Sequence, residues 1–200
     1  MYISKHFKNT DHNETIAFMR KYSFGTIITA INNLPFATHL PFIIEQKEET
    51  VFITSHFAKA NLQANQLNGE VLVIFNEPHA YVSPRFYEKE QNVPTWNYIA
   101  VHAYGKASII ATKDDQLQMM EQMILNYDAP YLSQWNGLND EFKNKMLNGI
   151  VAFQIRVTLL EAKHKLSQNR SQTERAEIIN TFETSNDANE IQIAEYMKNR

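Results

Sequence analysis

Apolar residues recur along the chain at two spacings, which separate predicted helices from predicted strands. In "DHNETIAFMRKY", Ile16 and Met19 are three residues apart, and Asp11 precedes Glu14 by three residues in a capping-box pattern. A first helix is therefore predicted over residues 12–22. "FGTIITAI", "FATHLPFII" and "TVFITS" are short runs rich in β-branched and aromatic residues, separated by polar turns. These runs predict three consecutive strands.

The middle of the chain predicts a change from strands to helices. "HFAKANLQANQLN" carries apolar residues at helical spacing and stops before Gly69, so it predicts a short helix. "EVLVIFNEPHAYVSP" and "NYIAVHAYGKASIIA" predict two further strands, joined by the aromatic-rich loop "RFYEKEQNVPTW". "DDQLQMMEQMILNY" and "DEFKNKMLNGI" predict two helices, after which "VAFQIRVTLLEAKHKL" predicts the last strand.

The C-terminal segment completes the predicted order of elements. Two capping-box patterns, at residues 171–174 and 187–190, predict two terminal helices. The whole chain contains too few strand–helix–strand alternations for a parallel sheet. We therefore predict an α+β fold, an antiparallel β-barrel with peripheral helices, over residues 1–170, and a C-terminal helical tail over residues 171–200.

Composition excludes several kinds of chemistry. Of the 200 residues, 44% are hydrophobic, which is enough for a sizeable core, and the net charge of −3 gives no global attraction for DNA. Cysteine is absent, so disulfides, zinc–cysteine sites and thiol catalysis are excluded. The chain shows no signal-peptide pattern and no apolar run of membrane-spanning length. We therefore expect a soluble, cytoplasmic protein with no membrane partner.

The patterns of glycine, histidine and serine narrow the chemistry further. The five glycines form neither a G-x-G-x-x-G motif nor a P-loop, so side chains would have to hold any bound nucleotide. The seven histidines include no H-E-x-x-H motif, and no serine stands in a G-x-S-x-G context. We predict neither a metal site nor a hydrolase triad, and we assign no catalytic residue.

Five motifs, in register along the chain, carry a resemblance to a known family: "ATHLPF", "SHFAKANLQ", "PHAYVSPRFY", "VPTWNYIAVHAYG" and "EAKHKLSQNR". With them, residues 1–175 resemble the PaiB family of FMN-binding negative transcriptional regulators. The resemblance implies an FMN-binding split barrel, a homodimer and FMN held at the subunit interface. The chain departs from the family pattern at Leu62, Phe86, Ala162 and His164, and His164 stands where tryptophan is usual.

Two motifs in the first half of the chain supply candidate cofactor ligands. In "THLP", strand alternation places Thr38 and Leu40 on one face and His39 on the other. The resemblance implies that these residues contact the flavin ring or phosphate, whereas a lone strand histidine is more often structural.

"TSHFAKAN" is predicted to lead from a strand into a helix. It would bring Ser55, His56, Lys59 and Asn61 to a helix N-terminus, where free N–H groups and the helix dipole favour a phosphate. The plainer alternative is a helix N-cap followed by a solvated lysine.

The aromatic motif "VPTWNYIAVHAYG" supplies candidates for the flavin ring. We expect Trp96 to stack on the ring, and Asn97 and His102 to bond its carbonyl edge. Tyr98 and Tyr104 are assigned to the core or to a dimer interface, as is usual for aromatic strand residues.

"EAKHKLSQNR" places three cations and several hydrogen-bonding side chains directly after an apolar strand. Lys163 and Lys165 share one strand face, and we predict that they meet a flavin phosphate or an acidic ligand together with Lys59. The alternative is a solvated, charged strand end. The residues predicted to bond the ring edge are Ser167, Gln168 and Asn169.

Three functions follow as alternatives. The resemblance implies an FMN-binding transcriptional regulator, and DNA is a partner through the resemblance alone, because the predicted terminal helices hold more acidic than basic residues. The second alternative is an FMN-dependent oxidoreductase of the pyridoxamine-phosphate-oxidase or flavin-reductase type. The third is a protein that binds haem or another small ligand without catalysis, with His39, His56 and His102 as candidate axial ligands.

Overall fold

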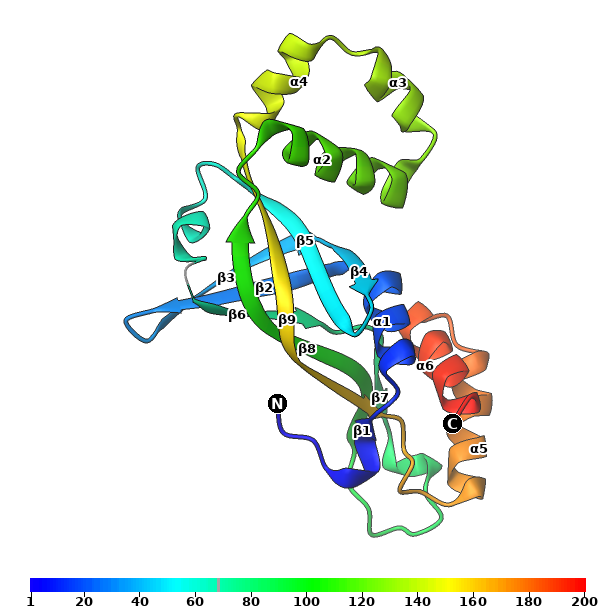
Figure 1. The fold of residues 1–200 in the computed structure, drawn as a ribbon. Helices are drawn as coiled ribbons and strands as arrows, with labels where there is room; N and C mark the ends of the chain where they lie inside the picture. The colour runs from blue at the N-terminus through cyan, green and yellow to red at the C-terminus, as the bar shows by residue number, and fades with distance from the viewer. Residues whose placement is uncertain (68) are drawn as a thin grey trace. The chain divides into compact units, whose positions relative to one another are not determined.

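The computed structural model describes residues 1–67 and 69–200 (Figure 1). Within this part of the chain the α-helices are α1 (His12–Lys21), α2 (Lys113–Asp128), α3 (Tyr131–Gly137), α4 (Asp140–Leu147), α5 (Gln172–Glu183) and α6 (Ala188–Lys198). The strands are β1 (Lys8–Asn9), β2 (Phe24–Ile31), β3 (Leu34–Pro41), β4 (Ile43–Lys47), β5 (Thr50–Ala58), β6 (Glu70–Phe75), β7 (His79–Val82), β8 (Thr95–Ile109) and β9 (Ile150–Lys165). Short 3-10 helices are η1 (Lys5–Phe7), η2 (Leu62–Gln66) and η3 (Pro84–Phe86). None of the helices described has the length and apolar run that a membrane crossing needs.

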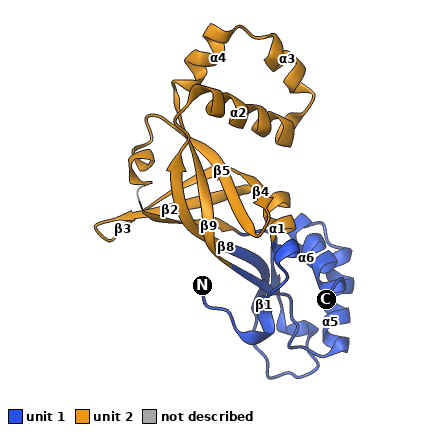
Figure 2. Ribbon diagram, viewed as in Figure 1, with its two compact units in different colours: residues 1–15, 76–102, 161–200 blue, residues 16–75, 103–160 orange. Residues whose placement is uncertain are grey.

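The chain divides into two compact units (Figure 2). The terminal unit comprises residues 1–15, 76–102 and 161–200, and the sheet unit comprises residues 16–75 and 103–160. β8 and β9 are long enough to contribute to both units. Helices α5 and α6 belong to the terminal unit, and the predicted domain boundary at residue 170 stays a prediction.

The sheet unit is built on antiparallel strands in the order β3-β2-β6-β8-β9-β5-β4. In β2 every second residue is turned inward, because successive side chains of a strand point to opposite faces. Across the sheet unit, the residues turned inward include Ile27, Ile53, Val73 and Phe153, and all four are fully buried. Helices α2, α3 and α4 follow one another between β8 and β9 (Figure 1). The predicted antiparallel α+β arrangement is confirmed by these pairings.

In the terminal unit α6 packs on a β-hairpin, and α5 packs on α6. β7 pairs with β8 in antiparallel register, and α6 packs on β7. Ile99, Ile178, Phe182 and Ile193 form its buried core. The predicted capping box at the start of α5 is confirmed: Glu174 N donates to the Ser171 hydroxyl, and Ser171 N donates to the Glu174 carboxylate.

One predicted helix is wrong, two predicted strands are each divided in two (β3 with β4, and β6 with β7), and one helix was not predicted. The helix expected over "HFAKANLQANQLN" is absent from its described residues, since β5 continues through Ala58 and only the five-residue η2 follows. His56 and Phe57 pair with β9 in the ladder, so tertiary strand pairing outweighs the helical spacing of the apolar residues. Three helices, not two, separate β8 from β9. The additional helix α3 starts after Pro130, whose fixed φ suits a helix start.

Candidate functional site

The candidate residues fall into two groups, one in each compact unit. The group in the sheet unit is Thr38, His39, Leu40, Ser55, His56, Lys59 and Asn61. The group in the terminal unit is Trp96, Asn97, His102, Lys163, Lys165, Ser167, Gln168 and Asn169. A shared phosphate site of Lys59 with Lys163 and Lys165 would join the two groups, and it stays a prediction.

In the sheet unit, the polar side chains of Thr38, Ser55 and Asn61 are engaged in internal hydrogen bonds. Thr38 Oγ1 donates to Gln63 Oε1 (2.5 Å) and accepts from Asn61 Nδ2 (3.0 Å). Asn61 Oδ1 in turn accepts from the Gln63 N–H (2.9 Å), which caps η2. Ser55 is fully buried and donates to the Pro41 carbonyl (2.7 Å). The structure thus brings Thr38 and Asn61 together, but their polar groups hold η2 against β3.

Gln63 organises this network, and nothing in the sequence pattern singled it out. Its side chain is fully buried. Its amide nitrogen lies 3.2 Å from the Ile27 carbonyl, 3.2 Å from Thr29 Oγ1 and 3.1 Å from the Phe36 carbonyl. A buried polar group must be hydrogen-bonded to be tolerated, so Gln63 fixes η2 on β2 and β3.

Two histidines of the sheet unit differ in their surroundings. His39 is exposed on β3, and its Nδ1 lies 2.8 Å from Thr26 Oγ1 on β2. His56 is half-buried on β5, and burial lowers the pKa of its imidazole. The His56 Nδ1 atom is buried without a hydrogen-bond partner among the described residues. Leu40, which follows His39 in the sequence, is half-buried, and its role as a cofactor contact stays a prediction.

Lys59 lies in the turn after β5, with an exposed side chain. Its N–H donates to the Gly149 carbonyl (2.8 Å), and no ion pair of Lys59 occurs in the described part of the chain. The predicted placement of Lys59 at a helix N-terminus is wrong, because His56 is inside a strand and η2 starts only at Leu62. Any anion held here would therefore meet the ammonium group and not a helix dipole.

In the terminal unit, Asn97 and Ser167 are joined inside the core. Asn97 Nδ2 and Ser167 Oγ are 3.0 Å apart, and Asn97 Nδ2 also lies 3.4 Å from Met197 Sδ. Both side chains are buried. Strand alternation turns Asn97 inward and Trp96 outward, so the two neighbours that sequence reasoning grouped together face opposite ways.

The two strand lysines both reach the N-terminal segment and the start of β8. Lys163 Nζ donates to the Tyr2 carbonyl (3.2 Å) and lies 5.1 Å from the centre of the Tyr98 ring. Lys165 Nζ donates to Thr95 Oγ1 and to the Trp96 carbonyl. Burial lowers the pKa of Lys165, and the positive charges of Lys163 and Arg170 lower it further.

The remaining candidates of this unit have separate surroundings. Gln168 folds back on β9, where Nε2 donates to the His164 carbonyl (2.5 Å) and Oε1 accepts from the Leu166 N–H (2.8 Å). Asn169 is exposed. His102 is half-buried, and burial lowers its pKa, as does the positive amino group of Met1, while Glu161 opposes them.

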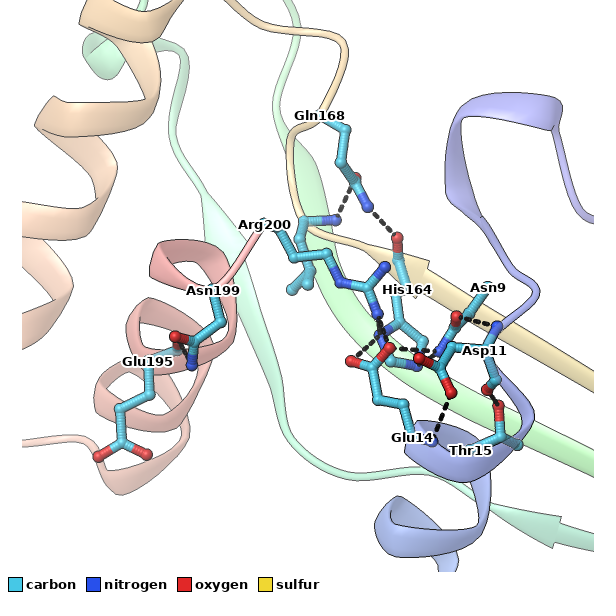
Figure 3. A network of polar contacts seen from close by, with 10 residues as sticks. Asn9, Asp11, Glu14, Thr15, His164, Gln168, Glu195, Asn199 and Arg200 are labelled. Atoms are coloured by element: carbon cyan, nitrogen blue, oxygen red, sulfur yellow. Dashed lines mark hydrogen bonds and ion pairs between the residues drawn. The ribbon is translucent and has the colours of Figure 1, made fainter.

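A polar cluster around the buried imidazole of His164 was also missed by sequence reasoning (Figure 3). Its Nδ1 lies 2.8 Å from Arg200 Nη2, and its Nε2 lies 3.1 Å from Asn9 Nδ2. Arg200 also contacts a Glu14 carboxylate oxygen (2.5 Å), and Asn9 donates to the same carboxylate (3.0 Å). The signal available was His164 itself, one of the four positions at which a departure from the family pattern is expected from the sequence.

Comparison with known proteins gives three findings. The sequence model of a family described as "Putative FMN-binding domain" matches residues 1–159. The "Protease synthase and sporulation protein PAI 2" of Bacillus subtilis is 41% identical over 206 residues, which cover 100% of this chain and 98% of the relative. An uncharacterized Emericella nidulans protein is 28% identical, covering 82% of this chain and 83% of the relative.

Solved structures with this fold include two flavoproteins. The flavocytochrome Anf3 of Azotobacter vinelandii matches with a TM-score of 0.63 at 14% identity, over 82% of this chain and 72% of that protein. The FAD and heme binding protein of Mycobacterium smegmatis matches with a TM-score of 0.63 at 10% identity, over 79% of this chain and 73% of that protein. The predicted α+β split-barrel fold class is confirmed.

Proposed function

This chain belongs to the PaiB family of FMN-binding domains, and from this premise we propose that it binds FMN as a cytoplasmic homodimer and lowers the transcription of target genes. FMN is proposed as a resident cofactor that would supply one- and two-electron redox chemistry. In the proposed role the cofactor biases one of two states of the protein, which needs a difference in binding free energy but no catalysis.

The observation that carries FMN binding is the orphaned imidazole nitrogen of His56. A buried polar atom without a partner costs about 1–3 kcal/mol, and a bound group that supplies a hydrogen bond would remove this cost. Three residues further on, Lys59 offers an exposed ammonium group. An imidazole and an ammonium group together suit a ligand that combines polar ring edges with a phosphate. We therefore assign His56 to a polar group of FMN and Lys59 to its phosphate.

We expect the purified chain to bind FMN, with His56→Leu and Lys59→Ala each lowering the affinity by about tenfold, or about 1.4 kcal/mol. The measurement is the quenching of flavin fluorescence during titration with protein. Riboflavin lacks the phosphate, so Lys59→Ala is expected to leave riboflavin affinity unchanged while His56→Leu lowers it. Lys106→Ala, which removes an exposed lysine of β8 in the same unit, is the matched control. Equal FMN affinity of all four proteins would contradict the assignment.

The regulatory part of the proposal makes a separate prediction. Its support is the set of five family motifs. The terminal helices add no support for DNA binding, because α5 and α6 carry more acidic than basic residues. We expect the protein to elute at the mass of a dimer and to shift a DNA fragment from upstream of its own coding sequence, with FMN changing the affinity and added salt weakening it. Steady NAD(P)H oxidation in the presence of FMN, without any DNA shift, would instead indicate an oxidoreductase.

A further inference from the structure

The β7–β8 hairpin of the terminal unit has two unlike faces. Ala80, Val82 and Asn97 alternate along one face and are buried. On the opposite face, aromatic side chains stand directly across from each other in two cross-strand pairs, His79 with Tyr98 and Tyr81 with Trp96. Tyr81 is 46% exposed and Trp96 is 50% exposed. We call this set of four rings the aromatic face.

The rings of the aromatic face leave room for another ring. The Trp96 ring centre is 6.0 Å from that of His79, with the planes at 45°, and 5.8 Å from that of Tyr81, with the planes at 73°. Neither pair is stacked face to face, so His79 and Tyr81 do not cover the broad faces of the Trp96 ring by stacking. A cluster of large, half-exposed aromatic rings is found more often at a binding surface than on the rest of a protein surface.

A cavity of about 400 Å³ adjoins the aromatic face. The residues that line it come from the segment after β6, from β7 and from β8, and they are Asn76, Pro78, His79, Trp96, Tyr98 and Ile99. This volume lies in the range of small-molecule sites, which combine apolar walls with a few polar groups. The polar side-chain groups of these residues are the amide of Asn76, the imidazole of His79, the hydroxyl of Tyr98 and the indole N–H of Trp96, and none of the lining residues is Lys, Arg, Asp or Glu.

Lys163 and Lys165 hold the two β8 rings of this face in place. The Lys163 ammonium lies 5.1 Å from the Tyr98 ring centre, an attractive cation–π distance. Lys165 donates to the backbone carbonyl of Trp96. Both ammonium groups are thus committed to positioning the strand, and the lysines act as positioning residues for the aromatic face.

The charge of the surroundings decides between kinds of ligand. The terminal unit contains ten Lys and Arg residues against twelve Asp and Glu residues, so it offers no general attraction for a polyanion. A single-stranded nucleic acid would need both stacking platforms and a basic groove, and only the former is present. A neutral ring with amide or carbonyl substituents matches the rings, the Asn76 amide and the His79 imidazole.

We propose that the aromatic face and its cavity bind the planar ring of a neutral heteroaromatic ligand, which stacks on Trp96 and hydrogen-bonds to Asn76 and His79. A flavin ring and a nicotinamide ring share this chemistry. The site is independent of the assignment of FMN phosphate to Lys59, because its residues all lie in the terminal unit.

The two tryptophans of the chain allow a direct test by fluorine NMR of protein labelled with 5-fluorotryptophan. Trp96 is half-exposed on the aromatic face, whereas Trp135 is only 5% exposed in α3 and serves as an internal reference. The probes are riboflavin and nicotinamide, which both lack a phosphate. We expect at least one probe to shift the Trp96 resonance saturably while the Trp135 resonance stays in place. A shift with riboflavin identifies a flavin-ring site, and a shift with nicotinamide alone identifies a nicotinamide site.

Variants of the cavity residues sharpen the test. Asn76→Ala and His79→Ala are each expected to weaken the effective probe by about fivefold, the worth of one hydrogen bond of about 1 kcal/mol. Lys89→Ala, at an exposed position of the same unit outside the cavity lining, is expected to change nothing. Failure of both probes to shift Trp96 at millimolar concentration overturns the proposal. So does an equal shift of both resonances, or a Trp96 resonance that moves with protein concentration alone, which would show a second copy covering the face.

The outcomes also separate this site from FMN binding. Loss of FMN affinity in Lys59→Ala with an unchanged Trp96 shift supports both sites. FMN that does not bind at all, together with a Trp96 shift by nicotinamide, overturns the proposed function and retains the aromatic site. FMN that binds through His56 and Lys59 without any Trp96 response overturns the aromatic site alone.

Discussion

Gln63→Glu is expected to lower the free energy of unfolding by about 3 kcal/mol or more at pH 7, one of the two largest effects that the structure predicts. The fully buried Gln63 amide nitrogen lies within hydrogen-bond distance of the Ile27 and Phe36 carbonyls. A glutamate has nearly the same shape, but it replaces this donor by an oxygen that faces other oxygens. The substitution therefore removes hydrogen bonds and buries an acceptor, or a charge, against acceptors.

Urea unfolding at pH 7 measures this effect, with Asn65→Asp as the matched control. Asn65 is exposed on the same short helix η2, so its change to aspartate adds the same charge without burying it. We expect the control to stay within about 0.5 kcal/mol of the unmodified chain. A Gln63→Glu protein as stable as its control would show that the hydrogen bonds of Gln63 do not hold η2.

The pH dependence of the Gln63→Glu deficit distinguishes lost hydrogen bonds from a buried charge. Burial raises the pKa of a carboxyl group, so the folded variant would bind a proton at a pH where the unfolded chain does not. The deficit relative to the unmodified chain should then shrink as the pH falls from 7 towards about 4.3, the ordinary pKa of glutamate. A deficit that is independent of pH would mean that the carboxylate has escaped to solvent.

The sequence predicted most of the fold because its strands are marked by local signals. The alternation in "FGTIITAI" and "TVFITS" predicted β2 and the body of β5, and Ser171 with Glu174 predicted the start of α5. The residues after Ser55 were assigned to a helix because their apolar residues recur at helical spacing. Pairing with β9, about one hundred residues away in the chain, decides that they continue a strand.

The candidate site was harder to predict because hydrogen-bond partners are distant in sequence. Thr38 and Asn61 have side chains of the kind that bind phosphates, but the structure shows them bonded to each other and to Gln63. Asn97 is likewise held by Ser167, seventy residues away. Residue type and spacing reveal which groups are able to bind a ligand. Only the fold reveals which of these groups, such as His56 Nδ1, have no hydrogen-bond partner among the described residues.

The second large effect is expected to be acid destabilisation through His164. Burial lowers the pKa of His164 to about 4, and the positive charge of Arg200 lowers it, while the Glu14 carboxylate opposes them. The geometry agrees, because Arg200 Nη2 can donate to His164 Nδ1 only when that nitrogen carries no proton. The other groups around the imidazole are the Asn9 amide and the Tyr196 ring. The folded chain therefore holds His164 neutral.

When the pKa of a histidine is lower in the folded than in the unfolded state, its contribution to the free energy of unfolding is complete above about pH 6.5. As the pH falls from 6.5 to 4, the unfolded chain takes up a proton that the folded chain refuses, so stability is lost. The loss amounts to roughly 3 kcal/mol in total and about 2 kcal/mol by pH 5. His56, whose pKa is also lowered by burial, adds to the loss with the same sign.

Urea unfolding at pH 7.5 and pH 5 isolates the contribution of His164 when the chain is compared with His164→Gln. The glutamine cannot titrate, so the loss of stability between the two pH values should be smaller in this variant by about 2 kcal/mol. His12→Gln removes an exposed imidazole at the start of α1 and is the matched control, expected to retain the full loss. Equal losses in all three proteins would mean that folding does not shift the pKa of His164, which would contradict the prediction. A larger loss in His164→Gln than in the unmodified chain would mean that His164 is protonated in the fold and that Glu14, not Arg200, determines its charge. In that case His164→Gln would destabilise the chain most at pH 5.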